Sequence, residues 1–367
     1  MTDAATPDTA PPNWLDWRWQ LQHTLRGPAL AQRFNLPPAS AAWMATGAGF
    51  EIGVTPWFAD LCAEQGRDGA LARQVLPSRE EADIAAFERA DPLGEDPHRV
   101  APGVVHKYPD RVLLLVTDTC ASYCRYCTRA RWVATQSESL DSAALDAAIA
   151  WIAANPMIRD VLISGGDPLL LSTRRLSRLL DRLAAIDHLQ FIRIGTRVPV
   201  FLPMRVDAAL ADALRPRRIP IYVNVHINHY AELPDFTRDR LALLADAGIP
   251  LGGQAVLLRG VNDDVNTLRD TFYRMLACRV RPYYLFHCDP VIGTSHLRTT
   301  VDRGLELMAG LVGHVSGMAV PKYCVDLEGG GKVPLWPSYI EGRTPTALRV
   351  RGYDGQLHTY PNEPREP

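Results

Sequence analysis

Residues 111–127, RVLLLVTDTCASYCRYC, join a short apolar run to three closely spaced cysteines. The run is rich in aliphatic residues and turns polar after Thr117, which is typical of a strand buried on both faces. The segments between similar runs, such as 141–154, have apolar residues at helical spacing. This alternation predicts an α/β fold with a parallel barrel or partial barrel, whose chemistry lies at the carboxyl ends of the strands. The predicted strands are 111–117, 160–164, 191–196, 220–227, 251–258 and 280–286, and a seventh apolar run covers 318–325.

The composition is that of a globular protein without a large net charge. Of the 367 residues, 47% are hydrophobic and 22% charged, and 39 Lys and Arg oppose 41 Asp and Glu. We expect neither nucleic acid nor a membrane as a partner, because this balance provides no field to recruit them. The longest uncharged apolar stretch, around 308–320, is shorter than the ~20 residues of a membrane span. We expect a disordered tail over 1–13. Because the N-terminus lacks the pattern of a secretory signal, we also expect a cytoplasmic protein.

Three of the seven cysteines lie within one short segment, at Cys120, Cys124 and Cys127. Their C-x3-C-x2-C spacing suits three irons of a 4Fe–4S cluster and leaves the fourth iron without a protein ligand. Zinc is the alternative, but structural zinc sites close with four ligands, and the chain has no second C-x2-C pair. His226 and His229 are a weak substitute for such a pair. The spacing therefore indicates a metal cofactor and favours a cluster over zinc.

The cysteine motif resembles that of the radical S-adenosylmethionine (SAM) enzymes, whose cluster binds the amino and carboxylate groups of SAM. Further segments are similar to the lysine 2,3-aminomutase family, namely 108–120, 124–129, 281–284 and 329–332. The resemblance implies a partial (β/α)6 radical SAM barrel with an N-terminal helical region and a C-terminal extension. It also implies pyridoxal 5′-phosphate as a cofactor. The chain then divides into a helical region over 14–105, the partial barrel over 106–300 and a segment with the pyridoxal phosphate lysine over 301–367.

The resemblance assigns several residues to SAM. The stretch SGGDP, residues 164–168, follows a predicted strand, and by itself it indicates a turn that uses glycine for a positive φ. In the radical SAM enzymes the corresponding segment contacts the methionine amino group. The residues implied for SAM are Gly165, Gly166 and Asp167, together with Tyr126 before the last cysteine and Gln254 on a later strand.

The stretch GGGK, residues 329–332, is not a phosphate loop, because Val333 follows the lysine where that motif needs Ser or Thr. A lysine on a glycine turn is usually a solvated surface residue, but a lysine that binds a planar cofactor also needs close backbone approach. The resemblance places the pyridoxal phosphate lysine here, at Lys332. It also implies a phosphate-binding set, in which many relatives have arginine at the first position: Lys107, Tyr108 and Arg111.

The substrate residues are implied in the same way. Arginine suits an amino acid carboxylate because its guanidinium can donate two parallel hydrogen bonds, and the resemblance assigns this role to Arg129. Asp289 and Asp326 match two carboxylates that bind the distal ammonium in lysine-specific relatives, and Asp91 is a third candidate. One aspartate alone is usually a cap or turn residue. Two buried carboxylates need a counter-charge, which indicates a cationic substrate side chain and excludes glutamate.

The resemblance therefore implies an isomerase that converts L-lysine to β-lysine, by abstraction of a C3 hydrogen and migration of the amino group from C2 to C3. The same reaction on arginine or another cationic amino acid is one alternative. A relative that modifies a lysine of an elongation factor is a second. A non-enzymatic iron–sulfur or zinc module is an alternative of another class.

The expected partners are the amino acid substrate, an external one-electron reductant of the flavodoxin or ferredoxin kind, and further copies of the chain in a homo-oligomer (dimer or higher). Longer family members have a C-terminal zinc cluster with an additional cysteine where this chain has Asp264. No cysteine follows Cys324, so we expect no zinc site. The sequence leaves open which cationic amino acid reacts, the product stereochemistry, the electron donor, the pathway and the oligomeric state.

Overall fold

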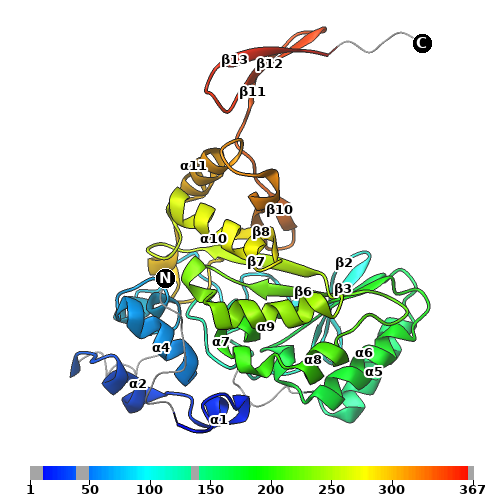
Figure 1. Cartoon of the computed structure of the whole chain (residues 1–367). Helices are drawn as coiled ribbons and strands as arrows, with labels where there is room; N and C mark the ends of the chain where they lie inside the picture. Colours follow the sequence, from blue (N-terminus) through cyan, green and yellow to red (C-terminus); the bar gives the residue numbers. More distant parts are fainter. Residues whose placement is uncertain (1–10, 39–48, 134–139, 363–367) are drawn as a thin grey trace.

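A mostly parallel sheet of ten strands forms the centre of the computed structural model, which describes residues 11–38, 49–133 and 140–362 (Figure 1). Neighbouring strands of this sheet follow one another in the sequence from β1 to β10. Strands β3 to β9 are parallel, whereas β1, β2 and β10 pair antiparallel at the two edges. In the described part of the chain β1 and β10 do not pair, so the sheet is open, as expected for a partial barrel.

The parallel strands predicted from the sequence are confirmed, with ends that differ by a few residues. They are short and apolar because both faces of a parallel sheet are covered. The strands of the sheet are β1 (Arg99–Ala101), β2 (Val104–Tyr108), β3 (Arg111–Leu115), β4 (Asp160–Ser164), β5 (Phe191–Thr196), β6 (Ile221–His226), β7 (Leu251–Leu257), β8 (Arg281–His287), β9 (Lys322–Leu327) and β10 (Gly331–Pro334).

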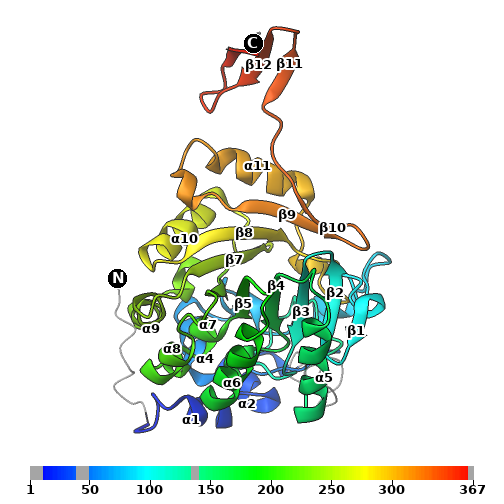
Figure 2. The same ribbon diagram turned by 90° about the vertical axis from the view of Figure 1, so that its right-hand side faces the viewer.

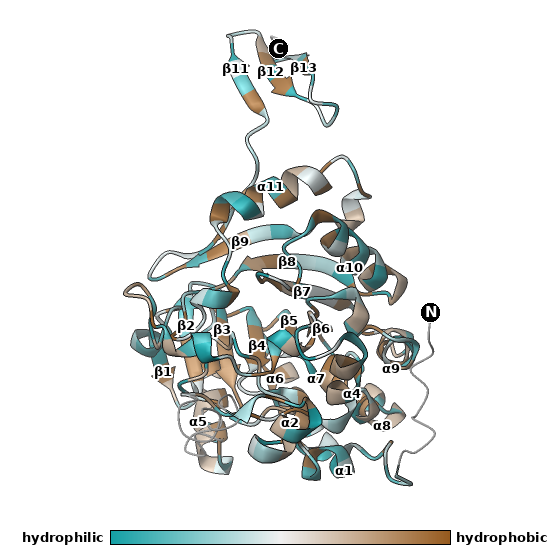
Figure 3. Cartoon of the chain, turned by 90° about the vertical axis from the view of Figure 1, so that its left-hand side faces the viewer, coloured by the Kyte–Doolittle hydropathy of each residue, from teal (hydrophilic) through white to brown (hydrophobic). Residues whose placement is uncertain are grey.

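Helices connect the parallel strands and cover the sheet, as Figures 1 and 3 show. In α6, Leu176, Leu180 and Leu183 are buried on one face while Arg178 is exposed, and the Ser172 side chain caps the first turn. This amphipathic pattern places α6 against β5. The helices are α1 (Trp17–Gln22), α2 (Gly27–Arg33), α4 (Pro56–Gln65), α5 (Ser142–Ala153), α6 (Thr173–Ala184), α7 (Val198–Phe201), α8 (Ala208–Ala213), α9 (Asp235–Asp246), α10 (Val265–Ala277) and α11 (Val301–Leu311).

The N-terminal region packs on the barrel through buried polar contacts. The Thr55 hydroxyl, for example, donates a hydrogen bond of 2.6 Å to the carbonyl of Phe201 in α7. The predicted helical region 14–105 contains α1, α2 and α4, but it also contains β1, and its boundary falls inside β2. The division of the chain at this point therefore stays a proposal.

The first and last described segments of the chain lie at the edges of this body. Residues 1–10 of the predicted tail are outside the described part, and the carbonyl of Pro11 accepts a hydrogen bond of 2.9 Å from the backbone N–H of Trp14. At the other end, α11, β9 and β10 continue the main fold, and three antiparallel strands form a separate sheet beyond α11 (Figure 2). These strands are β11 (Ile340–Arg343), β12 (Ala347–Arg351) and β13 (Leu357–Pro361). Among the described helices, none combines the length and apolar character needed to cross a membrane.

The turn after β4 approaches the turn after β3 very closely. The Gly166 N–H donates to the carbonyl of Thr117 at 2.5 Å, and the Asp167 N–H donates to the carbonyl of Thr119 at 2.8 Å. A Cβ on Gly165 would lie 2.2 Å from the Thr117 oxygen, and one on Gly166 would lie 2.3 Å from the Thr119 oxygen. Only glycine fits at these two positions. The two glycines therefore allow the turn after β4 to pack directly against the turn after β3, which leads to the cysteines.

We expect Gly166→Ala to lower the free energy of unfolding by about 1–3 kcal/mol, because backbone atoms of Thr119 would have to move to admit the methyl group. Gly195→Ala in β5 is a matched control, since its new Cβ would meet its nearest neighbours at an ordinary 3.9 Å. Urea denaturation of both variants measures the difference. An equally small effect of the two substitutions would contradict the tight approach of these turns.

Candidate active site

Cys120, Cys124 and Cys127 lie on the loop after β3 as free, half-buried thiols. Burial and the neighbouring Cys127 raise the pKa of Cys120 well above its usual range, and burial and Cys124 raise the pKa of Cys127 to about 11. Three thiols so placed cannot easily be thiolates together without a cation among them. The donor set therefore fits an iron–sulfur cluster, whose irons keep the sulfurs deprotonated.

A single-ion site and a cluster place different demands on three thiols. A zinc ion gathers its sulfur ligands at ~2.3 Å, whereas a 4Fe–4S cluster takes one thiolate per iron and spreads its ligands further apart. Within the described ranges no three His, Cys, Asp or Glu side chains form a group that could hold one metal ion.

Asp167 turns its carboxylate into the fold. It accepts hydrogen bonds from the Thr196 hydroxyl at 2.7 Å and from the backbone N–H groups of Arg197 at 2.7 Å and Val198 at 3.0 Å. Burial raises its pKa to about 6, although these bonds oppose the shift. The carboxylate thus ties the turn after β4 to the end of β5, and the part of this turn left for a ligand is its backbone.

Tyr126 and Arg197 belong to one buried polar network behind the cysteine loop. Arg197 donates to the Cys124 sulfur at 2.9 Å and to the Tyr126 hydroxyl at 2.6 Å. The same hydroxyl bonds to His226 Nε2 at 3.2 Å. Gln254 pairs in register with His226, so both side chains lie on the same face of the sheet. The fold therefore brings together the predicted SAM residues Tyr126, Asp167 and Gln254.

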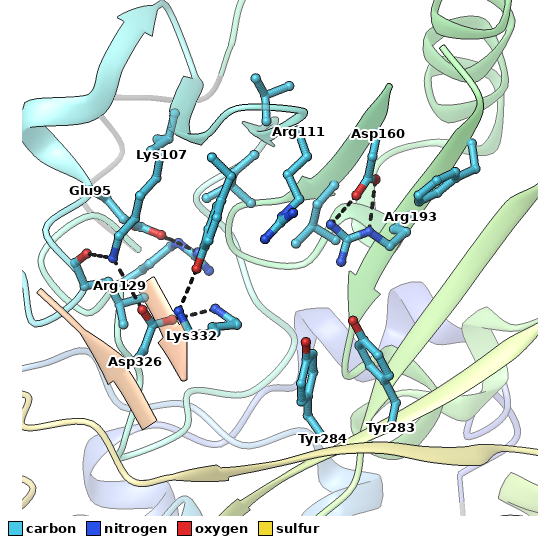
Figure 4. A pocket seen from close by; sticks show the side chains of 17 residues that line it. Glu95, Lys107, Arg111, Arg129, Asp160, Arg193, Tyr283, Tyr284, Asp326 and Lys332 are labelled. Atoms are coloured by element: carbon cyan, nitrogen blue, oxygen red, sulfur yellow. Dashed lines mark hydrogen bonds and ion pairs between the residues drawn. The ribbon is translucent and has the colours of Figure 1, made fainter. Parts of the chain in front are cut away.

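A cavity of about 330 Å³ opens beside the β9–β10 hairpin (Figure 4). The first residues of β3, β4 and β5 line it, so it lies toward the amino ends of these strands. The sequence predicted that the chemistry lies at the carboxyl ends of the strands. This prediction agrees with the position of the cysteine loop but not with the position of this cavity. Six residues that the sequence analysis assigned to cofactor or substrate line the cavity: Lys107, Tyr108, Arg111, Arg129, Asp326 and Lys332.

Asp326 lies between two ammonium groups, as Figure 4 shows. Its carboxylate accepts from Lys332 Nζ at 2.5 Å and from Lys107 Nζ at 3.3 Å, and its side chain is only 6% exposed. Asp326 and Lys332 are cross-strand partners in the β9–β10 hairpin, which sets this pairing. Lys107 also donates to the carbonyls of Leu93 at 2.7 Å and Leu327 at 3.2 Å, so its ammonium has three acceptors within the protein.

Asp289 follows β8 and is electrostatically linked to this group, although it does not line the cavity. Burial and the charge of Asp326 raise its pKa to about 7, while Lys332 opposes the shift. The two predicted substrate carboxylates therefore influence each other beside the predicted cofactor lysine.

Arg129 projects into the cavity two residues after the last cysteine of the loop. Its guanidinium donates two hydrogen bonds to Glu95, from Nε at 3.0 Å and from Nη2 at 2.6 Å. Asp91, the third acidic candidate, instead forms an ion pair of 2.9 Å with Arg131 and is not part of the cavity lining. The fold thus brings Arg129 to the site but not Asp91.

The other side of the cavity is aromatic and basic. The Arg111 guanidinium lies 3.9 Å from the centre of the Tyr108 ring, and the Tyr108 hydroxyl accepts from the Lys332 N–H at 2.9 Å. Arg193 and Asp160 form a two-bond ion pair at 3.0 and 2.6 Å. This side offers flat rings and fixed cations, which suit a planar anionic cofactor.

Several residues of the site were not predicted from the sequence. Charged residues in otherwise apolar strands were an available signal for Asp160 and Arg193, because such positions are buried and need partners. Arg197 and Glu95 gave no signal, since each acts on a residue far away in the sequence.

Comparison with known proteins identifies the chain. The model of the radical SAM superfamily matches residues 114–271, and the model named lysine-2,3-aminomutase matches residues 308–366. The L-lysine 2,3-aminomutase of Fusobacterium nucleatum is 38% identical over 96% of this chain and 84% of its own length. That of Methanococcus maripaludis is 40% identical over 95% and 82%, respectively.

A relative with another name also matches. The glutamate 2,3-aminomutase of Clostridioides difficile is 34% identical over 96% of this chain and 84% of its own length. These relatives are aminomutases, which are isomerases, and the superfamily match implies a 4Fe–4S cluster and SAM. The chain therefore belongs to the lysine 2,3-aminomutase family of radical SAM enzymes.

Proposed function

We propose that this enzyme converts L-lysine to β-lysine, with pyridoxal 5′-phosphate held by Lys332. The observation that carries the proposal is the group of Asp326, Lys332 and Lys107 at the cavity, with Asp289 electrostatically linked to it. It separates a lysine substrate from glutamate, although enzymes named for each of these amino acids are similar to this chain.

The charge balance favours a substrate with a cationic side chain. Asp326 forms ion pairs with Lys332 and Lys107, and Asp289 interacts electrostatically with these two lysines and with Arg298. When Lys332 holds the cofactor, its ammonium no longer neutralises Asp326, so this buried carboxylate keeps its ion pair with Lys107 but loses one of its two counter-charges. The distal ammonium of lysine restores the balance, whereas a side-chain carboxylate would add a third negative charge.

Arg129 is the proposed binder of the substrate carboxylate. Two of its nitrogens, Nε and Nη2, are used by Glu95, which fixes the plane of the guanidinium. In the proposal Nη1 donates to the substrate carboxylate while Glu95 keeps the side chain in position. A substrate held by Arg129 at one end and by Asp289 and Asp326 at the other has its C2 and C3 fixed between them.

The cofactor residues follow from the same arrangement. We assign the cluster to Cys120, Cys124 and Cys127, and SAM to Tyr126, Gln254 and the Gly165–Asp167 turn. Tyr108 and Arg111 remain the proposed phosphate ligands, whereas Lys107 is reassigned to the balance of Asp326 because its ammonium is already satisfied there. When bound, the cluster and SAM supply a radical that takes a hydrogen atom from C3, and pyridoxal phosphate supplies a conjugated system for the migrating amino group.

The proposal extends to the surroundings of the enzyme. A one-electron reductant is consistent with the superfamily, and we propose a flavodoxin-like or ferredoxin-like protein in the cytoplasm for this role. We also propose that the chain forms a dimer or a higher homo-oligomer.

The substrate assignment is tested by anaerobic incubation of the reduced, reconstituted enzyme with SAM, pyridoxal phosphate and, in parallel, lysine, arginine and glutamate. We expect β-lysine as the main product, identified by chiral mass spectrometry. β-Arginine as the main product would move the substrate within the cationic class. β-Glutamate, or 5′-deoxyadenosine without any β-amino acid, would contradict the proposal.

We expect Lys332→Ala to abolish both turnover and the visible absorbance of bound pyridoxal phosphate, because no other cavity lysine is placed to replace it: Lys107 is held by its three acceptors. Lys322→Ala is the matched control, since this lysine is exposed on the same β9–β10 hairpin. Absorbance after gel filtration and β-lysine formation are the two measurements. A Lys332→Ala enzyme that keeps both properties would disprove the assignment.

The KM for lysine should rise as the pH falls below about 7, because Asp289 then takes up a proton and no longer attracts the substrate ammonium. Asp289→Asn should raise KM about tenfold at higher pH, equivalent to ~1.4 kcal/mol, and should flatten the pH dependence. Steady-state kinetics between about pH 6 and pH 8 test this expectation. Asp187→Asn, at an exposed site, should keep the original profile, and an unchanged profile in Asp289→Asn would remove this residue from the site.

A further inference from the structure

Arg197 is a buried cation in contact with one of the three clustered cysteines. Its Nη1 lies 2.9 Å from the Cys124 sulfur, and its side chain is 7% exposed. Neither the sequence motifs nor the proposed reaction assigns it a role. A guanidinium taken out of water needs fixed partners, and the structure provides them for Nη1 and Nη2, although Nε has none.

The position of Arg197 is fixed from several sides. The Asp167 carboxylate binds its backbone N–H at 2.7 Å. Its Nη2 donates to Gln74 at 2.5 Å and to Glu232 at 3.0 Å, and its guanidinium carbon lies 4.2 Å from the centre of the Phe201 ring. The guanidinium therefore has little freedom to move away from the sulfur.

Glu232 is the counter-ion of Arg197 and is fully buried. Its carboxylate accepts hydrogen bonds from Arg197, from Gln74 Nε2 at 2.7 Å and from the Asn228 N–H at 3.0 Å. All three partners donate to it, as suits an ionised carboxylate. Glu232 accepts from Nη2, whereas Nη1 donates to the Cys124 sulfur, so the nitrogen that faces the sulfur is not the one bound to the counter-ion.

We propose that Arg197 is a positioning residue that sets the reduction potential of the cluster through its contact with the Cys124 sulfur. The inference rests on the proposed assignment of Cys124 as a cluster ligand. One-electron reduction makes the cluster and its thiolates more negative, and a nearby cation that donates hydrogen bonds to a ligand sulfur stabilises that state. Arg197 thus raises the potential, and Glu232 offsets part of the effect.

The electron comes from the external reductant and stays on the cluster until SAM accepts it, so Arg197 neither gains nor loses an electron. Its contribution is to make the cluster easier to reduce. Because Asp167 holds the Arg197 backbone and also lies in the turn assigned to SAM, the same contacts keep this cation at a fixed distance from the SAM site.

The test is a redox titration of the reconstituted enzyme without SAM, followed by the electron paramagnetic resonance signal of the reduced cluster. Arg197→Met should lower the reduced-to-oxidised ratio at a fixed potential about tenfold, equivalent to ~59 mV for one electron. Glu232→Gln should shift the ratio in the opposite direction, because it removes the negative counter-charge. Arg197→Lys keeps the charge and should fall between Arg197→Met and the unaltered enzyme.

Arg205→Met is the control, since Arg205 is equally buried but donates to the carbonyls of Leu169 and Leu171 instead of a sulfur. The reduction potential of the cluster in Arg205→Met should match that in the unaltered enzyme. If Arg197→Met does not retain a cluster, Arg197→Lys and Glu232→Gln still decide the question. Potentials that are unchanged in these variants would overturn the inference, whereas the lack of a 4Fe–4S signal in the unaltered enzyme would instead overturn the proposed cluster ligands.

Discussion

The carboxylate of Asp326 is nearly removed from solvent and is held by ammonium groups from two different strands. A buried charge of this kind is stable only while it has a counter-charge, so every event at the cavity must preserve the balance. The β9–β10 hairpin sets Lys332 opposite Asp326 in register, and β2 brings Lys107 from the far edge of the sheet. In the proposed function, a cofactor held by Lys332 removes one of these counter-charges and a cationic substrate supplies another. The proposed preference for lysine thus follows from how the hairpin pairs Asp326 with Lys332, together with the neighbouring Asp289.

A second charged group lies at the opposite ends of the strands. There Arg197 faces the cysteine loop, and Asp167 and Glu232 hold it from behind. The two groups are joined by the short segment from Cys127 to Arg129, which leaves the cysteine loop and enters the cavity. The parallel strands therefore separate the residues assigned to radical formation from those assigned to the substrate. The short segment from Cys127 to Arg129 connects the two sets. At the cysteine end, the backbone of Gly166 packs closely against that of Thr119.

The sequence predicted the parts of the molecule that local pattern determines. Buried parallel strands are continuous apolar runs, so β3 to β9 could be located within a few residues, and the cysteine spacing lies within one loop. The short edge strands β1 and β2 and the exposed strands β11 to β13 lack such runs. Arg197 and Glu95 could not be assigned, and Lys107 was assigned to the phosphate instead of Asp326, because their contacts are with partners distant in the sequence. Asp167 was identified as a site residue, but its inward carboxylate follows from contacts with β5 that no motif encodes.

The charge balance at Asp326 can be measured by calorimetric titration of the holoenzyme with lysine and with norleucine, which lacks only the distal ammonium. If the two buried carboxylates require that ammonium, lysine binds roughly thirtyfold or more tightly than norleucine. This ratio corresponds to a cost of ~2 kcal/mol or more for leaving a buried charge unpaired. Equal affinities for the two amino acids would show that the cavity does not need a positive charge from its substrate, and the assignment of Asp289 and Asp326 would be wrong.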